Sequence, residues 1–264
     1  MAASAGHQHR TRFSHPTRID NRFYPLRPGM RFVLVGSARE HGGRVRHREV
    51  FIISDATKKI DGVRTVVIWD RDYYRGRLRE GELTFQAQGD GGAVWNFGEY
   101  PEEFSRGHVT GAPDTWIAGL QRARAGVLMP DRPRLGQPAY RQGWAPSVGF
   151  ADVAKVHATG LRVCVPAGCY RHVLETEEGD PTDRSSHQFK YYAPGVGNVR
   201  VGFSGGGDEE RLELVSAGRL SAGDMAEVDR RVLAIDHRGY RVSPHVYGRT
   251  LRARVRGRGT GFTG

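Results

Sequence analysis

The sequence has few cysteines and no long apolar run. Its two cysteines, Cys164 and Cys169, allow one intramolecular disulfide at most in a chain of 264 residues. No stretch approaches the roughly 20 consecutive apolar residues that a membrane-spanning helix needs. Residues 1–13 are polar and lack the apolar core of a secretory signal peptide. These absences predict a cytoplasmic protein, in which free thiols are expected. The alternative is a cross-strand disulfide, because the spacing of Cys164 and Cys169 could place them opposite each other across a hairpin.

The positive charge lies mainly at the two ends of the chain. The formal net charge is +11, but residues 1–31 hold six arginines against Asp20, and residues 249–264 hold five arginines and no acid. The body between them is nearly neutral. A nucleic-acid partner is not expected, because nucleic-acid binding requires a basic stripe on the folded surface. We expect a flexible basic arm at 1–22, a single β-barrel-like domain at 23–248 and a basic Gly/Arg-rich tail at 249–264.

Glycine and proline are abundant and divide the chain into short apolar segments. The 36 glycines and 13 prolines favour many strands and turns over a helical bundle. Residues 31–99 predict a meander of five strands, in which Asp61 and Gly62 form a two-residue hairpin turn. Residues 100–135 predict a long, less regular excursion over one mouth of the sheet. Further strands are expected at 138–144, 152–157, 161–165, 170–177, 188–192, 199–203 and 211–215.

One helix is expected late in the chain. Ser221 is a good N-cap residue, apolar residues recur at helical spacing at positions 225, 228, 232 and 235, and Gly239 is expected to end the helix. The predicted fold class is mainly β: an antiparallel meander curled into a barrel or half barrel, with one late amphipathic helix. Barrels of this size often enclose one small ligand.

Several short motifs resemble a known group of proteins. Residues 163–170 are Val-Cys-Val-Pro-Ala-Gly-Cys-Tyr, and residues 190–199 are Lys-Tyr-Tyr-Ala-Pro-Gly-Val-Gly-Asn-Val. Together with Trp-Asn-Phe-Gly-Glu at 95–99 and Ala-Tyr-Arg-Gln at 139–142, they resemble a group of uncharacterised bacterial β-sheet proteins. Many of that group look exported, and they are similar to lipocalin-like or lipoprotein-carrier-like half barrels. The resemblance covers residues 23–216 and implies a fold more than an activity.

The chain departs from that group at two points. Gly143 stands where the relatives carry an acid after the Tyr-Arg-Gln triplet. A polar arm stands where they carry a signal peptide. Both departures indicate a repurposed cytoplasmic copy with a role of its own.

Motifs for the common cofactors are absent. The sequence contains no Walker phosphate loop, no dinucleotide-binding fingerprint and no Gly-x-Ser-x-Gly nucleophile elbow. The eleven histidines are scattered, and their one close pair, His7 and His9, lies in the arm. We therefore expect neither a metal site nor a cofactor.

Acids in the third expected strand are the first candidates for a site. Asp70, Asp72 and Tyr74 fall on the same strand face as Val66 and Ile68, because side chains alternate along a strand. If this face lines the barrel, burial raises the pKa of the carboxyls and makes them usable proton donors or acceptors. The alternative is a solvated outer face on which the acids pair with neighbouring arginines.

Glu99 is a second candidate acid, on a strand whose Trp95 and Phe97 are expected to share its face. A carboxylate beside two aromatic rings suits a general acid or a cation stabiliser, and the alternative is a surface acid at a strand end. Tyr140 is a further catalytic candidate. The remaining residues are expected to contact the substrate through hydrogen bonds or aromatic surface. They are Tyr74, Gln86, Trp95, Phe97, Trp116, Trp144 and Tyr191.

The leading hypothesis is a small-molecule-binding barrel that acts without a cofactor as a cyclase, isomerase or lyase. Its expected partner is a hydrophobic small molecule, such as a natural-product intermediate, and positioning would supply much of the rate effect. The main alternative is a non-catalytic binding or carrier protein. A third is an interaction protein that uses its arginine-rich arms. An acid at a cavity wall favours the enzyme, whereas a filled core would exclude both hypotheses that need a cavity.

Overall fold

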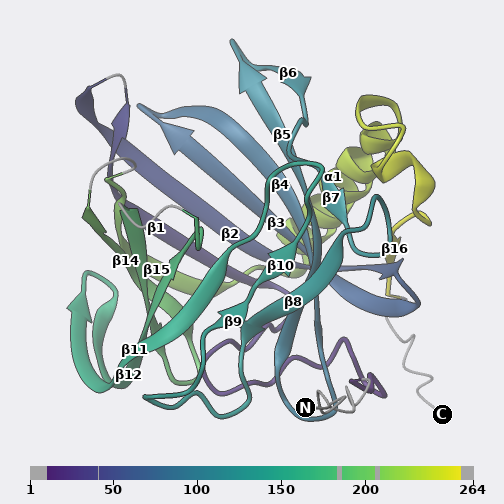
Figure 1. Cartoon of the computed structure of the whole chain (residues 1–264). Helices are drawn as coiled ribbons and strands as arrows, with labels where there is room; N and C mark the ends of the chain where they lie inside the picture. Colours follow the sequence, from purple (N-terminus) through teal and green to yellow (C-terminus); the bar gives the residue numbers. More distant parts are fainter. Residues whose placement is uncertain (1–10, 41, 183–185, 206–208, 257–264) are drawn as a thin grey trace, which may run out of the picture.

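A computed structural model describes residues 11–40, 42–182, 186–205 and 209–256 of the chain. Within them the protein is mainly β, with one large antiparallel sheet and a single α-helix, α1 (Ala222–Val242) (Figure 1). The sheet curls strongly but does not close into a continuous ladder, so the molecule is a half barrel. The predicted fold class is confirmed.

Long antiparallel strands make up most of the sheet. Asp61 and Gly62 form the turn between the second and third strands with φ of 46° and 82°, and these positive values are what the predicted two-residue hairpin requires. The strands of the N-terminal meander are β1 (Met30–Glu40), β2 (Gly43–Ile60), β3 (Val63–Tyr74), β4 (Arg77–Gln88) and β5 (Val94–Ser105). The later long strands are β11 (Val153–Val165), β12 (Gly168–Gly179), β13 (Ser186–Ala193), β14 (Gly197–Gly205) and β15 (Arg211–Arg219).

The segment 100–135, expected as a less regular excursion over one mouth of the sheet, alternates between turns and strands that belong to the sheet. It holds the end of β5 and three short strands, β6 (His108–Gly111), β7 (Trp116–Ile117) and β8 (Arg124–Met129). All three pair with β5. Backbone groups of a buried segment must find hydrogen-bond partners, and here the edge of β5 supplies them.

The two edges of the sheet meet at one stretch of chain. The strands follow the order β10-β8-β5-β4-β3-β2-β1-β15-β14-β13-β12-β11-β9. At one end β9 (Tyr140–Arg141) pairs with β11, and at the other β10 (Gly143–Trp144) pairs with β8. Only Gln142 separates β9 from β10, so residues 140–144 bridge the open seam of the half barrel.

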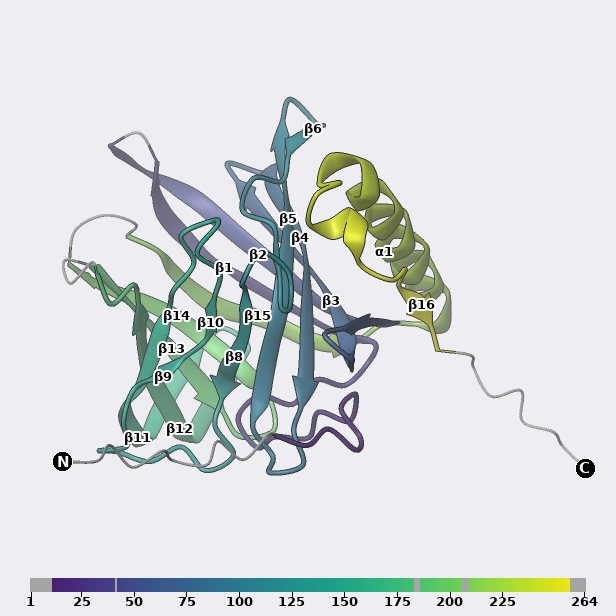
Figure 2. The same ribbon diagram turned by 45° about the vertical axis from the view of Figure 1, so that its right-hand side comes forward.

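The two faces of the sheet pack against different partners. On the outer face, Leu83, Phe85 and Ala87 belong to a core that includes residues of α1, which lies against the outside of the sheet (Figure 2). On the inner face, Ile53, Val66 and Ile68 belong to a second core. The alternation along β4 therefore places Leu83, Phe85 and Ala87 on the outer face and leaves the even-numbered residues of β4 on the inner face.

The helix begins where the sequence predicted and ends later. The backbone N–H of Asp224 donates a 3.1 Å hydrogen bond to the hydroxyl of the N-cap, Ser221. Gly239 does not end the helix, which continues to Val242. A β-carbon at Gly239 would lie 2.6 Å from Cδ1 of Tyr247, so the glycine is needed for close packing and not for termination. Tyr247 begins the short 3-10 helix η1 (Tyr247–Arg249) that folds back on α1.

We expect Gly239→Ala to destabilise the protein by about 1–3 kcal/mol, since the new methyl group overpacks the contact with the Tyr247 ring. This reverses the usual helical preference, by which alanine is favoured over glycine by about 1 kcal/mol. Gly223→Ala is the matched control, because the nearest atom to its β-carbon is 3.9 Å away. Urea unfolding of both variants checks the difference, and equal effects would contradict the packing explanation.

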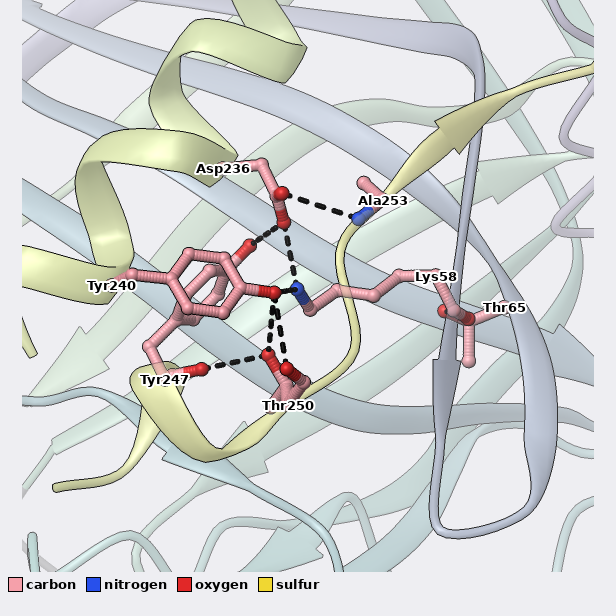
Figure 3. A network of polar contacts seen from close by, with 7 residues as sticks. All are labelled: Lys58, Thr65, Asp236, Tyr240, Tyr247, Thr250 and Ala253. Carbon is pink, nitrogen blue, oxygen red and sulfur yellow. Dashed lines mark hydrogen bonds and ion pairs between the residues drawn. The ribbon is translucent and has the colours of Figure 1, made fainter. Parts of the chain in front are cut away.

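A buried polar network attaches the helix to the sheet. The ammonium of Lys58 on β2 lies 2.7 Å from Oδ1 of Asp236 on α1, and both side chains are almost fully buried (Figure 3). The hydroxyl of Tyr247 and the backbone N–H of Ala253 also donate to Asp236, at 2.8 and 3.1 Å. Lys58 donates in addition to the hydroxyl of Tyr240 at 3.2 Å. Three donors converge on the Asp236 carboxylate, which makes it the centre of this network. A second ion pair, between Arg238 on α1 and the buried Glu102 on β5, also attaches the helix to the sheet.

Parts of the predicted arm and tail pack on the sheet. The ring of Phe13 lies 5.5 Å from that of Phe97, and Ile19 is buried. Near the other end, β16 (Arg254–Val255) pairs with β2. Residues 1–10 and 257–264, which include His7 and His9, lie outside the described residues.

The two cysteines are joined. Cys164 on β11 lies directly opposite Cys169 on β12, and a disulfide connects them. The prediction of free thiols is wrong, because the tight turn between these strands brings the cysteines together as a cross-strand pair. Among the described residues, the one α-helix is too polar to cross a membrane.

Candidate functional site

A cavity of about 290 Å³ lies on the inner side of the sheet. Strands β1 to β5 supply one wall, and β13, β14 and residues 24–26 supply much of the rest. Its apolar lining comes from Leu26, Phe32, Leu34, Phe51, Leu128, Val196 and Val201. Its polar lining comes from Tyr24, Glu49, Asp70, Asp72, Thr84, Gln86, Asn96, Glu99, Gln188, Lys190, Tyr192, Asn198 and Glu210.

Carboxylates follow one another across the strands of this wall. Glu49 of β2 lies opposite Asp72 of β3, and Asp70 of β3 lies opposite Glu82 of β4. Glu99 of β5 faces Thr84 on β4. Like charges directly opposite each other destabilise a sheet. The row of acids therefore works against folding stability, which is typical of residues kept for a function.

Glu49 on β2 and Asp70 on β3 lie diagonally across neighbouring strands at the centre of the row, and their charges repel each other. Burial, and then the negative charges of Asp72 and Glu210, raise the pKa of Glu49 to about 7. Burial and the charge of Glu49 raise the pKa of Asp70 well above its ordinary value. Two carboxyls this close cannot both ionise easily, so the pair retains a proton near neutral pH.

Glu99 is fixed by two donors. Nδ2 of Asn96 donates to one carboxylate oxygen at 2.5 Å, and Nε1 of Trp116 donates to the other at 2.9 Å. Burial raises the pKa of Glu99, while these hydrogen bonds oppose the shift by stabilising the charged form. Glu99 is therefore held in one orientation at the cavity wall.

His47 joins two of the lining acids. Its Nε2 lies 2.7 Å from Asp72 and its Nδ1 lies 2.9 Å from Glu210, and the ring of Tyr74 stacks on it at 4.4 Å. Burial would lower the pKa of His47, but its contacts with the two acids outweigh burial and raise that pKa to about 9. One positive charge is thus shared by Asp72 and Glu210 at neutral pH.

Lys190 is the one basic residue among those that line the cavity. Its ammonium lies 3.0 Å from the carboxylate of Glu178. Burial opposes the charged form, but the charge of Glu178 and the hydrogen bond to it raise the pKa of Lys190. Lys190 is therefore already neutralised by a partner of its own.

Gln86 presents an unused acceptor to the cavity. Its side chain is 4 % exposed, and its Nε2 donates to the hydroxyl of Thr84 at 3.3 Å. Its Oε1 accepts no hydrogen bond from the described residues. A buried acceptor without a donor lowers the stability of the protein. A ligand that donates a hydrogen bond to Oε1 would remove this cost.

The structure brings four of the predicted site residues together. Asp70, Asp72, Glu99 and Gln86 all line the cavity, with Asp70 and Asp72 on the same face as the buried Val66 and Ile68. Tyr74 lies beside them through its contact with His47. Tyr140 is outside the cavity lining, and its hydroxyl has no hydrogen-bond partner among the described residues.

Two aromatic residues that were expected to contact the substrate, Trp95 and Phe97, do not line the cavity. Trp95 and Phe97 pack with the outer core, whereas Glu99 faces the cavity. The register of β4 with β5 shifts between Thr84 and Gln86, so β5 carries one extra residue, and φ of Gly98 is 148° at that point. This bulge reverses the alternation and puts Glu99 on the opposite face from Trp95 and Phe97.

The other predicted aromatic contacts lie behind or away from the cavity. Trp116 is fully buried behind Glu99, which it holds. The ring of Trp144 lies 5.4 Å from the guanidinium of Arg124. The ring centroid of Tyr191 lies 5.7 Å from the guanidinium carbon of Arg200. Neither ring lines the cavity.

Sequence reasoning missed several acids and their partners. Glu49 lies within a strand of mixed polarity, and its importance comes from its cross-strand neighbours. His47 lies on the same strand as Glu49, whereas Lys190 comes from β13 and Glu210 from the loop before β15. The signal that could have found Glu49 was its even spacing from Phe51 and Ile53, which belong to the inner face.

Within the described residues, no three His, Cys, Asp or Glu side chains converge closely enough to hold a metal ion. The acids are spread along a wall, so the arrangement suits proton transfer or an organic ligand better than metal coordination.

The chain was also compared with known proteins. No family model matches it, and no curated protein matches it. Among solved structures, it is similar to a candidate exported protein with a YmcC-like fold from Bacteroides fragilis, with 14 % identity over 75 % of this chain and all of that one, at a TM-score of 0.42. It is also similar to a candidate lipoprotein from Parabacteroides distasonis, with 10 % identity over 75 % of this chain and 99 % of that one, at a TM-score of 0.34.

The predicted cytoplasmic location is corrected. The finding against it is the disulfide between Cys164 and Cys169, because disulfides persist in oxidising compartments and are rare in the cytosol. The prediction relied on the polar residues 1–13, of which the first ten lie outside the described residues.

Proposed function

We propose that this protein binds a compact small molecule in the inner cavity and transfers a proton to or from it without a cofactor. The observation that carries the proposal is the Glu49–Asp70 pair, a proton-sharing carboxyl pair that lines a partly apolar cavity. The reaction class it supports is that of a cyclase, isomerase or lyase acting on a largely hydrophobic substrate.

The cavity provides the two requirements of such chemistry. A carboxyl whose pKa lies near neutral pH serves well as a general acid or base, and such groups contribute about 10²–10⁴-fold to rates. Phe32, Leu34 and Phe51 give an apolar surface that orients a substrate against the pair. Glu99, held by Trp116 and Asn96, stabilises positive charge that develops during the reaction.

The test uses apolar ketones of the size of phenylacetone in deuterated buffer. Binding is followed by NMR shifts of cavity residues, and proton transfer by deuterium incorporation at the carbon next to the carbonyl. We expect both with the wild type, and a loss of exchange of about 10²-fold or more in Glu49→Gln and Asp70→Asn.

Leu128→Trp, which fills the cavity, is expected to abolish binding as well as exchange. Glu227→Gln, an exposed acid on the far side of α1, is the matched control for the loss of a carboxylate. Binding without exchange in the wild type would rule out the catalytic part and leave a binding protein. The absence of any shift at the cavity would refute the proposal as a whole.

A further inference from the structure

Carboxylates outnumber cations around the cavity. Lys190, the one lining base, is paired with Glu178, which lies outside the lining. Asp72 and Glu210 share the single charge of His47. The five lining acids are Glu49, Asp70, Asp72, Glu99 and Glu210.

The central pair has no cation of its own. No ion pair joins Glu49 or Asp70 to a Lys, Arg or His among the described residues, and Glu99 is held only by the neutral donors Trp116 and Asn96. The inner wall therefore presents a negative potential that the protein does not neutralise.

Gln86 gives an independent indication of the ligand. Its side chain is more than nine-tenths buried and lines the cavity, and its Oε1 lacks a donor. An amide oxygen can only accept, so the group that completes it must donate a hydrogen bond. The same donor requirement applies to the ionised carboxylates that line the same cavity.

The remaining lining fixes the shape of the ligand. Phe32 and Phe51, with ring centroids 6.3 Å apart, form an aromatic corner beside Leu34 and Val201. This surface receives an apolar body, and aromatic faces also attract cations. A metal ion does not suit the wall, because the described acids do not converge on one point.

We infer that the cavity takes an organic cation, a protonated amine or guanidine on a compact apolar body, with its nitrogen at Glu49, Asp70 and Gln86. This inference rests on the proposed function and names the class of its substrate. The nitrogen donates to the carboxylates and to Oε1 of Gln86, while the apolar body contacts Phe32 and Phe51.

The test compares three probes that share one phenyl body and differ in charge. Calorimetry at pH 7.5 measures the binding of 2-phenylethylammonium, 2-phenylethanol and phenylacetate to the full chain. We expect the ammonium to bind at least tenfold more tightly than the alcohol and the carboxylate not to bind measurably. In the double variant Glu49→Gln with Asp70→Asn, the affinity for 2-phenylethylammonium should fall close to the affinity for 2-phenylethanol.

Two further variants test whether the preference for the ammonium arises in the cavity. Gln86→Met removes the acceptor while keeping a side chain of similar volume. It should weaken the binding of 2-phenylethylammonium severalfold. Glu227→Gln removes a distant carboxylate and should leave all three affinities unchanged. Circular dichroism of each variant confirms that it is folded before binding is compared.

The outcomes separate this inference from the proposed function. Equal or tighter binding of the alcohol or of phenylacetate, or no binding of the ammonium, overturns the organic-cation inference. If ketone exchange persists in that case, the proposed function stands with a neutral or anionic substrate class. If neither the ketones nor the ammonium bind, both are overturned.

Discussion

Lys58→Met is expected to lower the free energy of unfolding by about 3–5 kcal/mol, the typical cost of removing one partner from a buried ion pair. The substitution keeps the apolar stem of the side chain and removes the ammonium that lies 2.7 Å from Asp236. Asp236 would remain buried with hydrogen bonds from Tyr247 and Ala253 but without a cation. The ammonium also lies 4.2 Å from the Tyr247 ring centroid, and this contact would be lost too.

Chemical unfolding of Lys58→Met, Asp236→Leu and the double variant measures the effect. The double variant should be more stable than either single variant, because it leaves no buried charge without a partner. Glu227→Ala is the control, since it removes only the surface ion pairs with Arg230 and Arg231 on the same helix and should cause little or no change. If Lys58→Met behaves like this control, the ion pair does not hold α1 to the sheet.

The protein is expected to lose stability as pH rises from about 5 to about 9. The pKa of Glu49 rises from its ordinary value of 4.5 to about 7 on folding. The folded state therefore binds this proton more tightly, and its contribution to stability is present at low pH and is lost as pH rises through 7. A shift of this size corresponds to a loss on the order of 3 kcal/mol.

His47 acts in the same direction over a higher range. Its pKa rises from an ordinary 6.5 to about 9 on folding, so its contribution is complete below pH 6.5 and is lost as pH rises through 9. At the acid end, the pKa of Glu178 is lowered by Lys190, despite the opposing effect of burial, so stability falls again below about pH 4.5. The expected maximum lies near pH 5.

Unfolding free energies measured at intervals from pH 4 to pH 9.5 check this profile. Glu49→Gln should reduce the slope between pH 5 and 7 and raise stability at pH 8, because a neutral amide replaces an acid that is costly to ionise. Part of the slope should remain, since burial also raises the pKa of Glu80 to about 7. The slope above pH 7 should remain in that variant, since it comes from His47. A profile with its maximum at pH 7 to 8 in the wild type would contradict the shared proton at Glu49 and Asp70.

The elements of the fold could be predicted where one local pattern decides them. The Asp61–Gly62 turn and the Ser221 cap each depend on residues within a few positions of one another. The face shared by Asp70, Asp72 and the inner core was predictable for the same reason. Local chemistry fixes local backbone geometry, and the strands then follow.

Predictions failed where the outcome depended on distant partners. Gly239 has the residue type of a helix stop, but the ring of Tyr247 requires a glycine there within a continuing helix. The bulge at Gly98 reversed the faces of Trp95 and Phe97 relative to Glu99. A single inserted residue has this effect because the side-chain period of a strand is two.

The sequence by itself determined a β-rich chain with one capped helix and a strand face that carries Asp70 and Asp72. Only the tertiary structure decided that Glu49, Glu99 and Glu210 join them around one cavity, and that Lys58 and Asp236 meet. The reason is that strand alternation is set by neighbours in sequence, whereas burial, pairing and pKa depend on which strands lie side by side. The charge of the cavity, and with it the proposed ligand, is therefore a property of the curled sheet.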